Sequence, residues 1–294
     1  MKLAVADRKI NKSIKGIFLK FRRNPFEVFA SIIVWIMGLC SLGIFLYIVG
    51  FIGIKGIPNI TPSLFEWKYN SVNVSLMPAL ISTIYMTILA LLLVVPIGIS
   101  AAIYMVEYAK SNNRIVKIIQ ITTETLAGIP SIVYGLFGLL FFVTFLKWSY
   151  SMLAGAFTLA IMILPLIMRA SEEALKAVPD NYREGSYGLG TGKLRTVFKI
   201  VLPSAMPGIF AGVILAIGRI VGETVALIYT AGTVAQIPNN PMQSARTLSV
   251  HMFALSSEGL HTKEAYATAV ILLFTVMIIN ASSAMIAKKF GGKR

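Results

Sequence analysis

Six long apolar runs constrain the fold of this chain more than any other feature of its sequence. A bilayer core about 30 Å thick needs roughly 20 helical residues to cross it, and each run comes close to that length or exceeds it. Only 13% of the 294 residues are charged and 56% are hydrophobic, whereas soluble proteins have about 25% charged residues. We therefore predict an all-α polytopic membrane protein with six transmembrane helices, at residues 28–54, 76–106, 125–146, 152–168, 208–231 and 267–287.

The positions of Lys and Arg predict how these helices are oriented. The N-terminal tail holds 8 of them, the second loop 3, the fourth loop 6 and the C-terminal tail 4, which is 21 of the 27 in the chain. Cytoplasmic loops of membrane proteins carry such an excess. We therefore expect both termini and the fourth loop to be cytoplasmic in a cell (inner or plasma) membrane. Residues 1–27 would form a basic tail, and residues 28–75 the first transmembrane helix with its outer loop.

The basic residues in the predicted cytoplasmic segments account for most of the positive charge behind the formal net charge of +15. A nucleic-acid-binding protein needs its basic residues on one folded surface, but here they lie in short gaps between apolar runs. We therefore expect membrane lipid, and no nucleic acid, among the partners of the chain.

Two connections are long enough to fold locally. The fourth loop, residues 169–207, is polar and contains the helix-forming patterns "SEEALKAV" and "YREGSYGLG", each with acidic residues early in the pattern. These patterns predict two short helices joined near residues 190–192. The outer connection, residues 233–266, contains "ARTLSVHMFALSS", for which we expect a short helix at the outer surface.

The sequence offers little for catalysis or metal binding. Cys40 is the single cysteine, and His251 and His261 are ten residues apart without a metal-binding spacing. The stretch "GLGTGK" lacks the glycine and the Ser or Thr that a phosphate-binding loop requires. We therefore expect no catalytic residue, cofactor or metal, and a chain that is not itself an enzyme.

Arg219 and Glu223 are the two charged residues inside a predicted span. A charge at the bilayer centre costs roughly 3 kcal/mol, so both should face protein or a water-filled path. Four residues apart on a helix, they would share one face and neutralise each other. Two hypotheses remain: a structural ion pair, or an arginine that lines a path for an anion, since guanidinium suits oxyanion geometry. Gly218 and Gly222 add a small-xxx-small spacing that would let another helix approach closely.

The fourth loop carries a recognisable spacing. Glu184 is followed by Gly190, then by nine residues, Ile200 and Leu202-Pro203. This arrangement is similar to the EAA signature of ABC importer permeases, EAA-x3-G-x9-I-x-LP. The two alanines of the signature are Gly185 and Ser186 here, small residues that still permit close packing.

Two further stretches narrow the resemblance. "LAGIPSIVYGLFGL" and "GRIVGETVAL" resemble the permeases of phosphate-specific ABC importers, which work as a PstA/PstC pair. "LPSAMPGI" looks more like the PstA member. The resemblance covers residues 76–294, which it identifies as a type I ABC importer transmembrane domain with its coupling loop at 169–207.

The resemblance implies a function and partners. The chain would be half of a pathway for inorganic phosphate, beside a second permease of the PstC type. A pair of PstB-type ATPase subunits would bind the loop that contains Glu184, Gly185, Ser186, Gly190, Ile200, Leu202 and Pro203, and a PstS-type extracytoplasmic binding protein would deliver phosphate. Gly190, Gly192 and a helix break at Leu202-Pro203 would provide the mechanical link. The alternatives are a permease for another oxyanion or small solute, and a six-span channel or scaffold subunit without ATP coupling.

Overall fold

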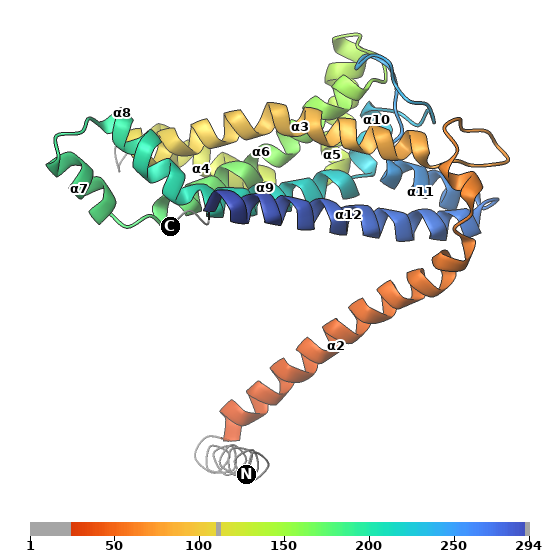
Figure 1. Ribbon diagram of the computed structural model, residues 1–294, viewed down its shortest axis with the longest axis horizontal. Coiled ribbons are helices and arrows are strands. Elements are labelled where there is room, and N and C mark those ends of the chain that lie inside the picture. Colours follow the sequence, from red (N-terminus) through yellow and green to blue (C-terminus); the bar gives the residue numbers. More distant parts are fainter. Residues whose placement is uncertain (1–24, 110–112, 292–294) are drawn as a thin grey trace. The chain divides into compact units, whose positions relative to one another are not determined.

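The computed structural model describes residues 25–109 and 113–291, and every regular element in these ranges is helical (Figure 1). The chain divides into two compact units, one up to Ile54 and one from Lys55 onward. Most of the predicted basic tail and the last basic residues of the chain lie outside the described residues. The first unit contains most of one apolar helix, α2 (Pro25–Gly56).

The second unit contains four long helices and several short ones. The long helices are α3 (Met77–Ile103), α6 (Met152–Lys176), α9 (Leu202–Gly222) and α12 (Thr262–Gly291). The short α-helices are α4 (Arg114–Ala127), α5 (Ser131–Gly138), α7 (Asn181–Gly188), α8 (Lys193–Thr196), α10 (Val225–Thr230) and α11 (Leu248–Glu258). Three π-helical stretches, Tyr104–Tyr108, Leu139–Phe145 and Val197–Val201, and two 3₁₀ turns, Ile57–Asn59 and Pro62–Phe65, complete the helical elements.

Five described helices are long and apolar enough to cross a membrane, and a bent helix pair brings the number to six. The predicted all-α membrane fold is therefore confirmed. The third predicted span, residues 125–146, is not one straight helix, because α4 and the helix that starts at Ser131 meet at 102°. Pro130 has no N–H to continue α4, and the carbonyl of Leu126 accepts the N–H of Ile129 at 3.1 Å and the Tyr134 hydroxyl at 2.7 Å.

The fifth predicted span, 208–231, has different ends in the structure. One helical run extends from Lys193 to Gly222 through α8, a π-helical stretch and α9. The predicted break at Leu202-Pro203 is therefore wrong, since Pro203 lies inside this run, where the π-helical stretch Val197–Val201 passes into α9. The pattern "SEEALKAV" forms the end of α6 instead of a separate helix.

The long helices of the second unit pack side by side, α3 on α6, α6 on α9 and α9 on α12 (Figure 1). Gly208 and Gly212 of α9 face Ala174 and Ala170 of α6, and a Cβ at either glycine would clash with the alanine. The predicted close approach at Gly218 and Gly222 is wrong within this chain, because a Cβ at Gly222 would meet no atom within 4 Å and one at Gly218 only Asn280, at 4.0 Å.

Different short helices lie at the two ends of the second unit. At one end lie α7 and α8, and at the other lies α11, which packs on α12 (Figure 1). The helix predicted from "ARTLSVHMFALSS" is confirmed as α11. The segment before α11 covers the start of α6: the N–H groups of Met152 and Leu153 donate to the carbonyls of Gln243 and Pro241.

Candidate functional site

Arg219 lies in the last turn of α9, and its side chain is exposed. Glu223 does not share its helix face, because α9 ends at Gly222 and Glu223 has an extended backbone. The Glu223 carboxylate instead accepts the N–H of Ala226 at 3.1 Å and so caps the start of α10. Its own carbonyl accepts the Ser249 hydroxyl at 2.6 Å. The predicted neutralisation of Arg219 by Glu223 is therefore wrong.

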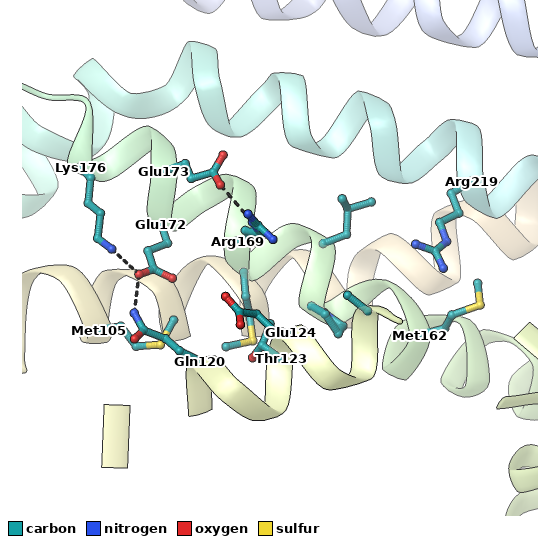
Figure 2. A pocket seen from close by; sticks show the side chains of 14 residues that line it. Met105, Gln120, Thr123, Glu124, Met162, Arg169, Glu172, Glu173, Lys176 and Arg219 are labelled. Carbon is teal, nitrogen blue, oxygen red and sulfur yellow. Dashed lines mark hydrogen bonds and ion pairs between the residues drawn. The ribbon is translucent and has the colours of Figure 1, made fainter. Parts of the chain in front are cut away.

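Arg219 lines a cavity of about 540 Å³ between α4, α6 and α9. Figure 2 shows Arg219 and Met162 at one end of this cavity, with Glu124 and Thr123 nearer the middle. Pro165 also lines the cavity. Arg219 further borders a second cavity of about 590 Å³, which Asn280 of α12 lines as well. Arg219 thus borders two cavities of the second unit.

The charges in the first cavity are mostly paired (Figure 2). Arg169 bonds Glu173 at 3.0 Å, and Lys176 bonds Glu172 at 2.6 Å. Among the described residues, Arg219 has no ion pair and no hydrogen bond. Unlike Arg169 and Lys176, it therefore has N–H donors that no described residue uses. A guanidinium presents five donors in a planar fork that matches oxyanions.

Most residues of this cavity have no recognisable signal in the sequence. Gln120 of α4 donates to Glu172 of α6 at 2.7 Å, yet the sequence analysis places most of the segment that forms α4 in a loop. One signal was available: Asn113 is a good N-cap, and its side chain accepts the N–H of Ile115 at 2.9 Å. The pairing of residues 52 positions apart has no signal in a single sequence.

The structure places the resemblance-derived coupling residues on and beside α7. Glu184 and Gly185 are exposed, and a Cβ at Gly185 would meet nothing within 4 Å. Ser186 is buried, and its hydroxyl bonds that of Thr196 in α8 at 2.8 Å. Gly190 ends the helix with a φ of +74°, a conformation that favours glycine.

The remaining coupling residues lie in the long helical run. Ile200 and Leu202 are half-buried, and Leu202 packs against the cluster that includes Leu175 and Val201. Pro203 is exposed. Leu202 therefore contributes to the packing where α8 leads into α9, while Glu184, Gly185 and Pro203 lie on the surface.

Arg183 holds α7 against the end of α3. Its guanidinium bonds Glu107 at 2.7 Å, with side chains only 15% and 5% exposed. It also donates to the carbonyls of Val178 and Leu175 and pairs with Asp180. Burial lowers the pKa of Arg183, but its bonds to the two carboxylates outweigh this and raise the pKa above its usual value. The sequence analysis did not find this pair, whose members are 76 positions apart.

The family of the chain is decided by comparison with known proteins. Residues 94–291 match the family model described as the binding-protein-dependent transport system inner membrane component. The chain belongs to this family. It is therefore a multi-pass membrane protein and a permease subunit of an ABC importer.

Individual relatives agree with this assignment. The chain is 32% identical over 282 residues, 90% of its length and 93% of the relative's, to the probable ABC transporter permease protein YqgI of Bacillus subtilis. It is 36% identical to the phosphate transport system permease protein PstA 1 of Mycobacterium tuberculosis, over 71% of this chain and 69% of the relative. It is 35% identical to PstA of Pasteurella multocida, over 77% and 81%.

Solved structures share the fold. A bacterial alginate ABC transporter in complex with its pentasaccharide-bound periplasmic protein aligns with a TM-score of 0.63 and 16% identity, covering 93% of this chain and 98% of that one. The MetNI methionine ABC transporter aligns at 0.58 and 18%, covering 72% and 93%. At these identities the likeness concerns the fold of the permease.

Proposed function

We propose that this chain is the PstA-type half of a pathway for inorganic phosphate in an ATP-driven importer. Two relatives are named as phosphate permeases. The observation that carries the proposal is Arg219, an exposed guanidinium on a cavity of about 540 Å³ with no ion pair among the described residues. An oxyanion in this cavity would receive donors that the fold leaves free.

The paired ions of the cavity would have a different task. Lys176 with Glu172, and Arg169 with Glu173, keep that part of the lining near neutral. A path that held several free cations would retain an anion too tightly to release it. One free guanidinium binds a passing phosphate reversibly.

The partners follow from the same proposal. A PstC-type permease would complete the pathway, a pair of PstB-type ATPase subunits would bind α7, and a PstS-type protein would deliver phosphate at the end that holds α11. Both termini and α7 would then lie in the cytoplasm, in agreement with the distribution of basic residues.

The test of the path residue is Arg219→Gln. We expect near-complete loss of uptake of radiolabelled phosphate, with the importer still assembled, because no carboxylate is left unpaired. Lys117→Gln is the matched control, since Lys117 is an exposed cation of α4 outside the cavity lining. Uptake near wild type in Arg219→Gln, at equal membrane abundance, would refute the proposal. Competition by sulfate as strong as by phosphate would assign the path to another oxyanion.

The test of the coupling surface is Gly185→Arg. The added side chain has open space within the chain, so the variant should fold but obstruct the ATPase contact and abolish uptake. Gly190→Arg is a poorer choice, because its positive φ would strain any arginine whatever the partner. Gly190→Asn, which tolerates this conformation, is the control. Normal uptake by Gly185→Arg would exclude α7 as the coupling surface, and a channel without ATP coupling would show such uptake.

A further inference from the structure

A second arginine without an ionic partner lies at the end of the second unit that holds α11. Arg246 is only 5% exposed, and its Nε is buried without a hydrogen-bond partner in the described part of the chain. The ring of Tyr69 lies 4.9 Å from the centre of the guanidinium. A cation–π contact covers one face of the group but satisfies none of its donors.

The guanidinium borders a small cavity of about 230 Å³. Val250 and Ala254 of α11 and Ile228 of α10 form much of the lining, and Thr233 and Ser257 are polar residues that also line it. A single water needs only about 10–15 Å³ of such space, so the cavity has room for a small solvated ion. It is separate from the cavity at Arg219, with which it shares no lining residue.

Burial of an unpaired charge is unfavourable unless an opposite charge or hydrogen bonds compensate it. No carboxylate of the described residues pairs with Arg246. Glu258 also lines the cavity, but it is exposed and makes no ion pair with the guanidinium. The compensation must therefore come from outside this part of the chain or from solvent.

We propose that Arg246 forms a second binding site for a small oxyanion, at the end of the bundle opposite α7. The guanidinium fork and the Thr233 hydroxyl supply the donors, and Tyr69 holds the fork in position. We take this oxyanion to be phosphate, and this identity rests on the proposed function. The site would receive phosphate before it reaches Arg219.

The neighbouring histidine is compatible with such a site. Burial and the charge of Arg246 lower the pKa of His251 to about 3. His251 is thus neutral at physiological pH, and Arg246 alone carries the positive charge. Ser249 of α11 donates to the carbonyl of Glu223, so α11 contacts the segment that follows α9.

The experiment counts phosphate sites on the assembled importer in lipid nanodiscs, by equilibrium binding of radiolabelled inorganic phosphate. We expect Arg246→Gln to remove one site per complex and Arg219→Gln to remove a different one, with the double variant losing both. Loss only in Arg246→Gln would refute the role of Arg219, and loss only in Arg219→Gln would refute the site at Arg246. The two proposals therefore fail separately.

A second pair of variants avoids dependence on the folding of Arg246→Gln. Ala254→Leu fills the cavity without removing the charge and should abolish the same site. Ser256→Leu adds the same bulk on α11 outside the lining and should leave binding unchanged. Glu258→Gln should strengthen binding several-fold, because it removes a repulsive carboxylate. A site count unchanged in both Arg246→Gln and Ala254→Leu overturns the proposal, as does a defect confined to docking of the binding protein.

Discussion

Arg183 is mostly buried and Arg246 is buried, at opposite ends of the second unit, yet their donors are used differently. Arg183 bonds two carboxylates and two backbone carbonyls around α7. Arg246 contacts the ring of Tyr69 and opens into a cavity. We propose that the use of its donors within the fold, and not burial alone, separates a structural guanidinium from a binding one. By this criterion Arg219 would belong with Arg246.

The largest effect should come from Arg183→Gln. It leaves the Glu107 carboxylate, only 5% exposed, without its cation, and breaking a buried pair costs about 3–5 kcal/mol. Arg246→Gln leaves no carboxylate behind and should cause no such loss. Denaturant unfolding of the purified chain in detergent measures both. Equal losses in the two variants would contradict the comparison, and Glu107→Gln added to Arg183→Gln should recover most of the stability.

A smaller effect should appear on acidification at the Arg246 end. The pKa of His251 is about 3 in the folded protein, against 6.5 for an unperturbed histidine, so between these values the unfolded chain binds a proton that the folded chain does not. Stability must therefore fall as pH falls below about 6.5, by about 2 kcal/mol at pH 5. His251→Leu should lack this component. Identical pH profiles for the two proteins, measured by thermal unfolding, would show that His251 titrates normally.

The smallest effect should come from Lys176→Gln. Lys176 lines the same cavity as Arg219 but is paired with Glu172, which keeps its bond to Gln120. Ion pairs of this spacing on helices contribute about 0.3–0.5 kcal/mol, and the Lys176 side chain is 58% exposed. Phosphate uptake should stay near wild type, in contrast to Arg219→Gln. A strong uptake defect would show that paired cations also serve the path, and would weaken the criterion drawn from the arginines.

The sequence predicted those features that depend on local pattern. Apolar runs located the spans, and the helix at α11 followed from its own residues. Arg219 was found because a charge in an apolar run is costly. The error at Glu223 had a physical cause: the i, i+4 rule assumes a continuous helix, whereas Glu223 leaves the helix to cap α10.

Other features depend on contacts between distant segments. Glu107 and Arg183 are 76 positions apart, and each looks like an ordinary loop charge in the sequence. Because the chain bends near Pro130, the start of the predicted span 125–146 belongs to α4. In α4, Gln120 lies beside Glu172 of α6. Gly208 and Gly212 pack closely on α6, whereas Gly218 and Gly222 do not pack closely on another helix of this chain. This difference depends on where the neighbouring helices lie, which a single sequence does not show.

The contact of Gly208 and Gly212 with α6 has a mechanical consequence. These glycines lie near the middle of the 30-residue run Lys193–Gly222, which is about 45 Å long at 1.5 Å per residue. If the run tilts as a rigid rod, this contact would be its pivot, with α8 on one side and Arg219 on the other. A tilt of about 5° that moves the α8 end by roughly 2 Å moves Arg219 by about 1 Å in the opposite direction. A rocking helix would carry the guanidinium across the cavity without bending.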